Sequence, residues 1–514
     1  MKVVVIGNGM VGSRFIDDLV AHDATAQVTV LGKETHEPYN RVLLSSVVAG
    51  KTAPDALATL TTDSDRVRTL LGVAAVAVDR GAMTVTDSNG DVHHYDRLVF
   101  ATGSQARIPG IQGIATDRGL LDGVSVLKDL DDATGIVSAI PKARRAVVLG
   151  AGVLGLEVAT GLASRGLSVT LVHHADRLME RQLGSAASSI AAGSLQRLGV
   201  KVITETSVAS ARDSRGAVKS VTLTDGTEVL ADLLVMCAGT IPETALARKA
   251  GLPCDRGIMV GEDLASPADP AVFAIGDCAQ PPEGGSGLVA QGWDQAKRLV
   301  AEWTADAVAE SRVDAPVEST DTAELDVTNV VRVKASGLDV VTMGLSGKFE
   351  HGERELRAVR MADPAIGRFV EVVVSHGLLV GATIVGDKQC ATELSSMYTR
   401  MLPVPSDPAH LIIRPLANAT RPAAVAVEDM DADHTICQCN SVPKGRIEEA
   451  IAEGCSSVED VSRATRAGTG CGDCRSLVGD IIRTCGAADA ADQKVPALAG
   501  SGVSATALAG TVEG

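Results

Sequence analysis

Four cysteines near the end of the chain have the spacing of a metal centre. The first pair is separated by one residue, and a second pair, which follows after 31 intervening residues, is separated by two. The four thiols belong to Cys437, Cys439, Cys471 and Cys474. Each pair can act as a bidentate clamp, and the segment between the pairs can bring the clamps together. Four thiolates bind either a structural zinc ion or an iron–sulfur cluster, and the spacing alone leaves both open.

Two glycine-rich turns upstream have the pattern G-x-G-x-x-G, starting at Gly7 and at Gly150. Each follows a strand-like run, Lys2–Ile6 or Ala146–Leu149, and each opens a helix-like segment. Such glycines let the backbone approach a pyrophosphate, whose charge faces the helix N-terminus. We therefore predict two dinucleotide sites, with a turn that binds no ligand as the alternative. The predicted contacts are Gly7, Gly9, Met10 and Gly12 in the first turn, and Gly150, Gly152, Leu154 and Gly155 in the second.

The presence of both kinds of site favours iron over zinc. A dinucleotide site upstream supplies electrons, which Zn²⁺ cannot carry because it has no redox chemistry. Iron–sulfur clusters carry electrons at potentials that their surroundings set. We therefore expect a chain that takes hydride at one end and passes on single electrons at the other.

The elements that must position these residues form an α/β pattern that occurs twice. Further strands are expected at Val28–Leu31 and Leu98–Ala101 in the first repeat, and at Ser168–Val172 and Leu233–Cys237 in the second. Strands that alternate with helices in this way predict two Rossmann-like domains, each with a parallel sheet.

Two smaller domains are expected after these repeats. Residues 323–405 contain strands such as Phe369–Val374 and Leu379–Ile384, which predict a small α+β domain. Residues 434–486 carry the cysteine clamps with helix-like segments between them, which predicts a small helical domain. Residues 487–514 are mostly Ala, Gly, Ser, Val and Thr without periodicity, and we expect them to be disordered.

Composition excludes several classes of function. The net charge of −17 argues against a nucleic-acid surface, which needs clustered Lys and Arg. No apolar run reaches the ~18 to 20 residues of a membrane-spanning helix, and the N-terminus lacks the pattern of a signal peptide. We therefore expect a cytoplasmic protein without a membrane partner, in which the other six cysteines are free thiols.

The first 305 residues resemble the two-dinucleotide-domain flavoproteins, the glutathione-reductase-like superfamily. Besides the two glycine turns, Thr102-Gly103 and Gly276-Asp277 end strands at the spacing of that superfamily. The resemblance implies that the first turn binds FAD and the second binds NAD(P)H. It also implies a discontinuous FAD domain, residues 1–112 and 242–305, and an NAD(P)H domain, residues 113–241. The implied FAD contacts are Thr102, Gly103, Gly276 and Asp277, with Glu34 as the candidate for the ribose hydroxyls.

The segment from Glu34 to Ser45 is similar to the flavin-side segment of bacterial assimilatory nitrite and nitrate reductases, and it adds Arg41 to the implied FAD contacts. In those reductases a lysine commonly follows the serine and lies near the flavin. Ser46 stands there in this chain, so that contact is absent or comes from elsewhere. Disulfide chemistry beside the flavin is excluded, because no cysteine precedes Cys237.

The resemblance also gives roles to residues of the second repeat. It implies that Glu157 lies where nicotinamide meets flavin, whereas the alternative is an acid favoured at a helix N-terminus by the dipole. Gly239 is implied as an NAD(P)H contact. The strand Ser168–Val172 ends in two histidines instead of the acid that binds an NAD ribose. His173 and Arg177 could accommodate a 2′-phosphate, or the histidines could be a surface pair, so the choice between NADH and NADPH stays open.

The cysteine segment, residues 434–486, resembles the bacterioferritin-associated-ferredoxin-like domain, which implies a [2Fe–2S] cluster on the four cysteines. The chain as a whole resembles the electron-transfer subunits of bacterial assimilatory nitrate and nitrite reductases. That resemblance implies an NAD(P)H-dependent flavoprotein oxidoreductase that passes electrons to a nitrate or nitrite reductase partner. Nitrite reduction within this chain is not expected, because sirohaem enzymes need a second cysteine quartet. The alternatives are a reductase for another ferredoxin or rubredoxin, a redox sensor, and a structural zinc protein.

Overall fold

The computed structural model describes residues 1–59, 64–117, 119–308, 330–347, 356–413, 430–437, 440, 442–470, 472 and 474–492. The chain divides into two compact units, Met1–Asn418 and Ala419–Gly514, which are described separately below. Across the described ranges, no helix is both long enough and apolar enough to cross a membrane.

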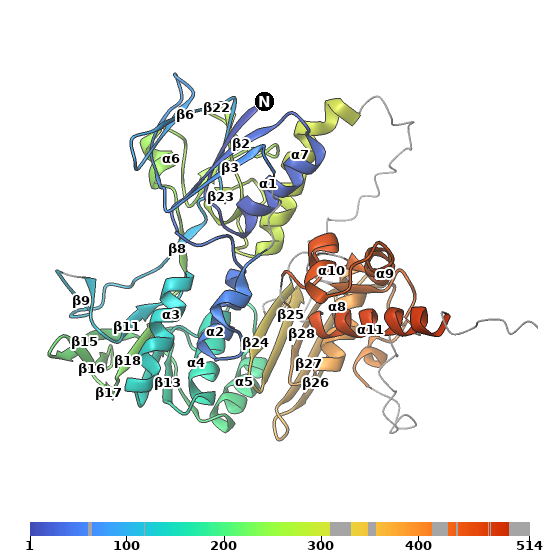
Figure 1. The fold of residues 1–514 in the computed structure, drawn as a ribbon. Helices are drawn as coiled ribbons and strands as arrows, with labels where there is room; N and C mark the ends of the chain where they lie inside the picture. The colour runs from blue at the N-terminus through green and yellow to red at the C-terminus, as the bar shows by residue number, and fades with distance from the viewer. Residues whose placement is uncertain are drawn as a thin grey trace, which may run out of the picture. The chain divides into compact units, whose positions relative to one another are not determined.

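A six-stranded sheet forms the centre of the first Rossmann-like domain, in the order β21-β22-β7-β1-β2-β3. The central strands are parallel, and β1 is buried at four of its five residues, as expected for a strand that is covered on both faces. Helices α1 and α7 lie side by side against it (Figure 1). The bounds are β1 Lys2–Ile6, α1 Met10–His22, β2 Gln27–Gly32, β3 Val67–Leu71, β7 Arg97–Phe100, β21 Ala265–Ser266, β22 Asp269–Ala274 and α7 Val289–Val308.

The second Rossmann-like domain has a five-stranded parallel sheet in the order β11-β18-β12-β13-β14. Helix α4 follows the second glycine turn directly and is buried along most of its length. The bounds are β11 Val124–Val126, α3 Leu130–Ala139, β12 Arg145–Leu149, α4 Val153–Ser164, β13 Ser168–Val172, α5 Ser185–Arg197, β14 Val200–Ile203 and β18 Leu233–Met236.

A third, smaller domain completes the first unit. Its antiparallel sheet has the order β24-β25-β28-β27-β26, with β24 at one edge, and helix α8 packs on it. The bounds are β24 Val330–Ala335, β25 Leu338–Gly344, β26 Arg357–Asp363, β27 Arg368–Ser375, β28 Leu378–Val385 and α8 Lys388–Thr399. The expected α+β character is therefore confirmed. Its core also includes Ile412, so the domain extends beyond the predicted end at residue 405.

Short elements connect these sheets. Helix α2 precedes a three-stranded sheet, β4-β5-β6, and a second three-stranded sheet, β15-β16-β17, follows β14. The bounds are α2 Leu44–Val48, β4 Ala75–Asp79, β5 Thr84–Asp87, β6 Val92–His94, β8 Ser104–Ala106, β9 Ala115–Thr116, β10 Gly119–Leu120, β15 Val208–Ser214, β16 Ala217–Leu223, β17 Glu228–Leu230, β19 Thr240–Pro242, α6 Ala245–Lys249, β20 Ile258–Met259 and β23 Ala279–Gln280.

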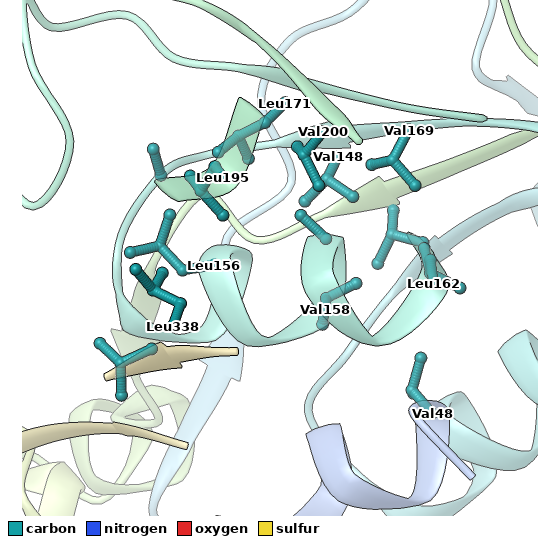
Figure 2. Close-up of a cluster of buried hydrophobic side chains, with 14 of the residues drawn as sticks. Val48, Val148, Leu156, Val158, Leu162, Val169, Leu171, Leu195, Val200 and Leu338 are labelled. Carbon is teal, nitrogen blue, oxygen red and sulfur yellow. The ribbon is translucent and has the colours of Figure 1, made fainter. Parts of the chain in front are cut away.

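One hydrophobic core joins the second Rossmann-like domain to its neighbours. Figure 2 shows side chains of β12, β13, β14 and α5 gathered around α4, together with Val48 of α2 and Leu338 of β25. Leu156 and Leu162 of α4 are fully buried there. Helix α4 is thus fixed from three sides, which also fixes the glycine turn at its N-terminus.

The second unit is a small helical module. Strands β29 (Thr435–Cys437) and β30 (Val442–Pro443) pair, and three helices follow: α9 (Lys444–Ala452), α10 (Val458–Thr465) and α11 (Arg475–Asp492). The predicted helical domain is confirmed. Helix α11 includes the first six residues of the segment expected to be disordered, residues 487–492. Residues 493–514 lie outside the described part, and the expectation of disorder there stays a prediction.

We predict that Leu156→Ala lowers the free energy of unfolding of the flavoprotein body by about 2–5 kcal/mol, because it leaves a cavity in the shared core. Leu230, which is 56% exposed on β17, offers a matched control. Leu230→Ala should change the free energy by less than about 0.5 kcal/mol. Urea unfolding followed by circular dichroism measures both, and equal effects would contradict the shared core.

Candidate cofactor sites

The outer glycines of the first turn are required by the fold itself. Gly7 has a φ of +112°, and a Cβ added to it would lie 2.2 Å from the carbonyl oxygen of Ala101 on the neighbouring strand. A Cβ on Gly12 would lie 2.5 Å from the carbonyl oxygen of Gly7. The second turn repeats this crowding, since a Cβ on Gly155 would lie 1.8 Å from the oxygen of Gly150. The crowding at these positions therefore explains why they are glycine, and no ligand needs to be invoked.

The middle glycines are different, because neither their backbone angles nor a close contact among the described residues requires glycine there. Gly9 and Gly152 have φ angles of −87° and −75°, which any residue adopts. No described heavy atom lies within 4 Å of a Cβ added to Gly152. A Cβ added to Gly9 would have one such neighbour, Nε of Arg41 at 3.7 Å. A glycine at these positions is compatible with close approach of a pyrophosphate, and the predicted contacts of both turns stay predictions. The Asn8 side-chain amide nitrogen is also buried without a hydrogen-bond partner among the described residues.

Two of the predicted FAD residues meet beside Gly9. Arg41 forms an ion pair with Glu34, and Tyr39 donates a hydrogen bond from its hydroxyl to Oε2 of Glu34 (2.7 Å). The Arg41 guanidinium lies 4.7 Å from the centroid of the Tyr39 ring. Burial raises the pKa of Tyr39, so this hydroxyl stays a donor at neutral pH. The structure therefore places one negative and one positive side chain next to the first turn.

A second polar group in this region contains a residue that the sequence did not indicate. Nζ of Lys128 donates to Oγ of Ser104 (2.7 Å) and lies 3.5 Å from Oδ2 of Asp277. Ser104 in turn donates to the same Asp277 oxygen (2.6 Å). Burial lowers the pKa of Lys128, an effect that Asp277 opposes. Lys128 lies in the segment between β11 and α3 and belongs to no short sequence motif. The fold brings it to Asp277.

The remaining predicted FAD residues lie where β1, β7 and β22 end side by side. Gly103 and Gly276 have φ angles of +68° and +74°. The amide of Gly276 donates to Gln295 of α7 (2.7 Å), and the hydroxyl of Thr102 donates to the carbonyl of Glu243 (2.8 Å). Ligands of open α/β sheets bind beyond the carboxyl ends of adjacent strands, which is where these residues stand.

Glu157 is buried and joins three elements. Its Oε2 accepts a hydrogen bond from the hydroxyl of Ser45 in α2 (2.5 Å), and its Oε1 accepts one from the backbone N–H of Lys334 in β24 (2.7 Å). Burial raises the pKa of Glu157, whereas the positive charges of Lys334 and Lys51 oppose the shift. Nζ of Lys334 is buried without a hydrogen-bond partner in the described part of the chain. A role of Glu157 at the nicotinamide stays a prediction, and its visible role is to connect domains.

His173 occupies a position that neither sequence alternative anticipated. It is only 4% exposed, so it is not a surface residue. Its Nδ1 accepts a hydrogen bond from the amide of Ala151 (3.1 Å), and its Nε2 lies 3.0 Å from Oε2 of Glu180. Because both ring nitrogens are used inside the protein, the structure does not support a phosphate contact through His173. Arg177 is bound to Asp176 and to the carbonyl of Leu183.

The end of β18 completes the second site. Gly239 has a φ of +94°, and no described heavy atom lies within 4 Å of a Cβ on it. Cys237, which precedes it by two residues, is partly buried, and burial together with the negative charge of Glu157 raises the pKa of its thiol to about 12. Leu154 lies in the first turn of α4. The Cys237 thiol therefore stays protonated and is not a candidate redox nucleophile.

In the second unit, Cys437 and Cys474 are buried in one core, and Cys439 and Cys471 lie outside the described residues. Asn440 links the two clamps. Its Nδ2 donates to the carbonyl of Arg466 (2.9 Å) and lies 3.7 Å from Sγ of Cys437. The turn before the second clamp is thereby tied to the first clamp. A buried clamp thiol with an amide donor beside it fits an iron–sulfur cluster.

Comparison with known proteins identifies the families to which both units are similar. Residues 1–300 match the family model "Pyridine nucleotide-disulphide oxidoreductase", and residues 435–484 match the "BFD-like [2Fe-2S] binding domain". The nitrite reductase [NAD(P)H] of Bacillus subtilis (strain 168) is 32% identical over 489 residues, which are 94% of this chain and 57% of the relative. The assimilatory nitrate reductase electron transfer subunit of the same organism is 30% identical over 490 residues, which are 94% of this chain and 59% of that relative.

Among solved structures, the covalent putidaredoxin reductase–putidaredoxin complex is similar, with a TM-score of 0.67 and 26% identity. The match covers 80% of this chain and 95% of the other. This chain spans less than two thirds of the length of the two curated relatives above.

These matches confirm the predicted fold class and the predicted cofactors, FAD, NAD(P)H and a [2Fe–2S] cluster. The expected resemblance to nitrate and nitrite reductase subunits is confirmed as well. The chain therefore belongs to the pyridine nucleotide-disulphide oxidoreductase family, as an NAD(P)H-dependent flavoprotein that carries a BFD-like [2Fe–2S] domain.

Proposed function

We propose that this chain is the electron-transfer component of an assimilatory nitrate or nitrite reductase and that it passes electrons from NAD(P)H to a catalytic partner. One observation carries the proposal: two relatives with those names match 94% of the chain, through the flavoprotein body and the cysteine unit together. We assign the reduction of nitrate or nitrite to the partner, in keeping with the name electron transfer subunit of the second relative.

The site residues are assigned by the open spaces and polar groups that surround the two turns. FAD is assigned to the first turn with the Glu34–Arg41 pair and the Lys128–Asp277 group, and NAD(P)H to the second turn. The cluster is assigned to the four clamp cysteines. When bound, FAD takes two electrons as hydride from NAD(P)H and can release them singly to a [2Fe–2S] centre.

The protein's own contribution is to align the two dinucleotides. Both turns end on helices whose positions the core fixes, and the Glu157 carboxylate holds α4 against α2 and β24. Lys128 brings a positive charge to the Asp277 carboxylate, so that acid is neutralised where the flavin would lie. These groups keep the geometry constant while the coenzyme enters and leaves.

The second candidate is a reductase for a separate small iron–sulfur protein. It is supported by the similarity to the putidaredoxin reductase–putidaredoxin complex. An acceptor assay tests the choice: the purified chain receives NADH or NADPH anaerobically, together with assimilatory nitrate reductase, assimilatory nitrite reductase, ferredoxin or rubredoxin. Rapid transfer to a nitrate or nitrite reductase is expected. Transfer to ferredoxin or rubredoxin alone would favour the second candidate.

We predict that Cys437→Ser abolishes the visible spectrum of the cluster and electron transfer to the partner, while NAD(P)H still reduces the bound FAD. The reason is that a clamp thiolate is lost, whereas the flavoprotein body is a separate compact unit. Cys455→Ser, which changes a partly buried cysteine between the clamps, is the matched control and should keep the cluster. Loss of FAD reduction in the folded Cys437→Ser protein would contradict the proposed order of carriers.

We predict that substitutions of the two middle glycines impair the binding of different cofactors. Gly9→Val should lower the FAD content to background, because its side chain fills the space beside Arg41. Gly152→Val should keep FAD and raise the KM for NAD(P)H at least about tenfold, which corresponds to about 1.4 kcal/mol. Flavin absorbance and steady-state rates with ferricyanide measure the two effects. Normal FAD content in a folded Gly9→Val protein would contradict the assignment of the first turn.

A further inference from the structure

The His173 ring is clamped between the second glycine turn and a loop. Ala151, the middle residue of Gly150-Ala151-Gly152, points its amide at Nδ1 of His173 (3.1 Å). A backbone amide is always a donor, so Nδ1 must be the acceptor and Nε2 carries the proton. That proton faces the carboxylate of Glu180, whose Oε2 lies 3.0 Å from Nε2. The neutral ring therefore satisfies both neighbours at once.

The same loop holds the other side of Ala151. The amide of Met179 donates to the carbonyl oxygen of Ala151 (3.0 Å), and Met179 has a φ of +46°, which is uncommon for a residue with a side chain. Gly150 in turn donates to the carbonyl of Val172 at the end of β13 (2.8 Å). The backbone of the turn is thus fixed by β13 and by the loop that follows it. Of these contacts, the one at Nδ1 depends on a titratable group.

We propose that His173 is a positioning residue for NAD(P)H, that it holds the pyrophosphate-binding turn through the Ala151 amide, and that coenzyme affinity falls when the ring is protonated. This inference rests on the assignment of the second turn to NAD(P)H. A protonated ring carries N–H on both nitrogens, so Nδ1–H would oppose the Ala151 N–H. Either the ring or the turn must then move.

The charges around the ring decide when this happens. Burial lowers the pKa of His173 below the ordinary 6.5, and the neighbouring His174 ring acts in the same direction. The carboxylates of Glu180 and Asp176 oppose it. Because the pKa is lowered, the ring is neutral at pH 7 and takes up a proton only at acidic pH, so the affinity should be constant near neutral pH and decrease as the pH falls.

The test measures the KM for NADH and for NADPH from pH 8 to pH 5.5 in the full chain, with ferricyanide as acceptor. In the unmodified protein we expect both KM values to rise about three- to tenfold at the acidic end, with a smaller change in kcat. His173→Asn places an amide oxygen near the position of Nδ1, which accepts at every pH, so its KM should be nearly independent of pH. His173→Leu removes the acceptor, so its KM should be raised throughout.

His94→Asn is the matched control, since His94 is an exposed histidine on β6, and it should keep the pH dependence of the unmodified protein. Equal KM profiles for the unmodified protein and His173→Asn would overturn the proposal. An effect of His173→Asn on NADPH alone would also overturn it, because that result indicates a 2′-phosphate contact. If neither coenzyme reduces FAD at any pH, the proposed function itself fails, and this result is distinct from normal turnover with an unchanged profile.

Discussion

The architecture of both dinucleotide sites depends on how closely backbone approaches backbone at the two glycine turns. In each turn a Cβ added to the first or the last glycine would overlap a backbone carbonyl oxygen. These oxygens belong to Ala101 and Gly7 in the first turn and to Cys237 and Gly150 in the second. The helices can start this close to the strand ends only because the side chains are missing. That closeness brings the helix N-termini to the carboxyl edge of each sheet, where a pyrophosphate can be held.

Side chains from distant segments build the rest of each site around these turns. On the FAD side, Lys128 connects Ser104 and Asp277, which are 173 residues apart. On the NAD(P)H side, His173 and Met179 fix the turn from the loop after β13. The two sites therefore share one plan, in which glycines make the space and long-range polar contacts keep its shape.

The local parts of this plan could be predicted from the sequence. Glycine spacing, the apolar runs before it and the paired cysteines are short patterns, and their physical causes act within a few residues. The contacts of Glu157 could not be predicted, because Lys334 lies 177 residues away and reaches it only when the third domain packs on α4. The contacts of His173 could not be predicted for a similar reason: its position after β13 suggests a 2′-phosphate contact or a surface pair, whereas the ring is buried and contacts Ala151 and Glu180. Lys128 has no local pattern at all.

The contact between Glu157 and the backbone of Lys334 also covers part of a sheet edge. Strand β24 is at the edge of its antiparallel sheet, and the outward N–H groups of an edge strand can pair with a strand of another molecule. The carboxylate occupies one of these groups, and helix α4 lies along the strand. An acid that looks like part of an active site thus also leaves one fewer N–H group on this edge for pairing with a strand of another molecule.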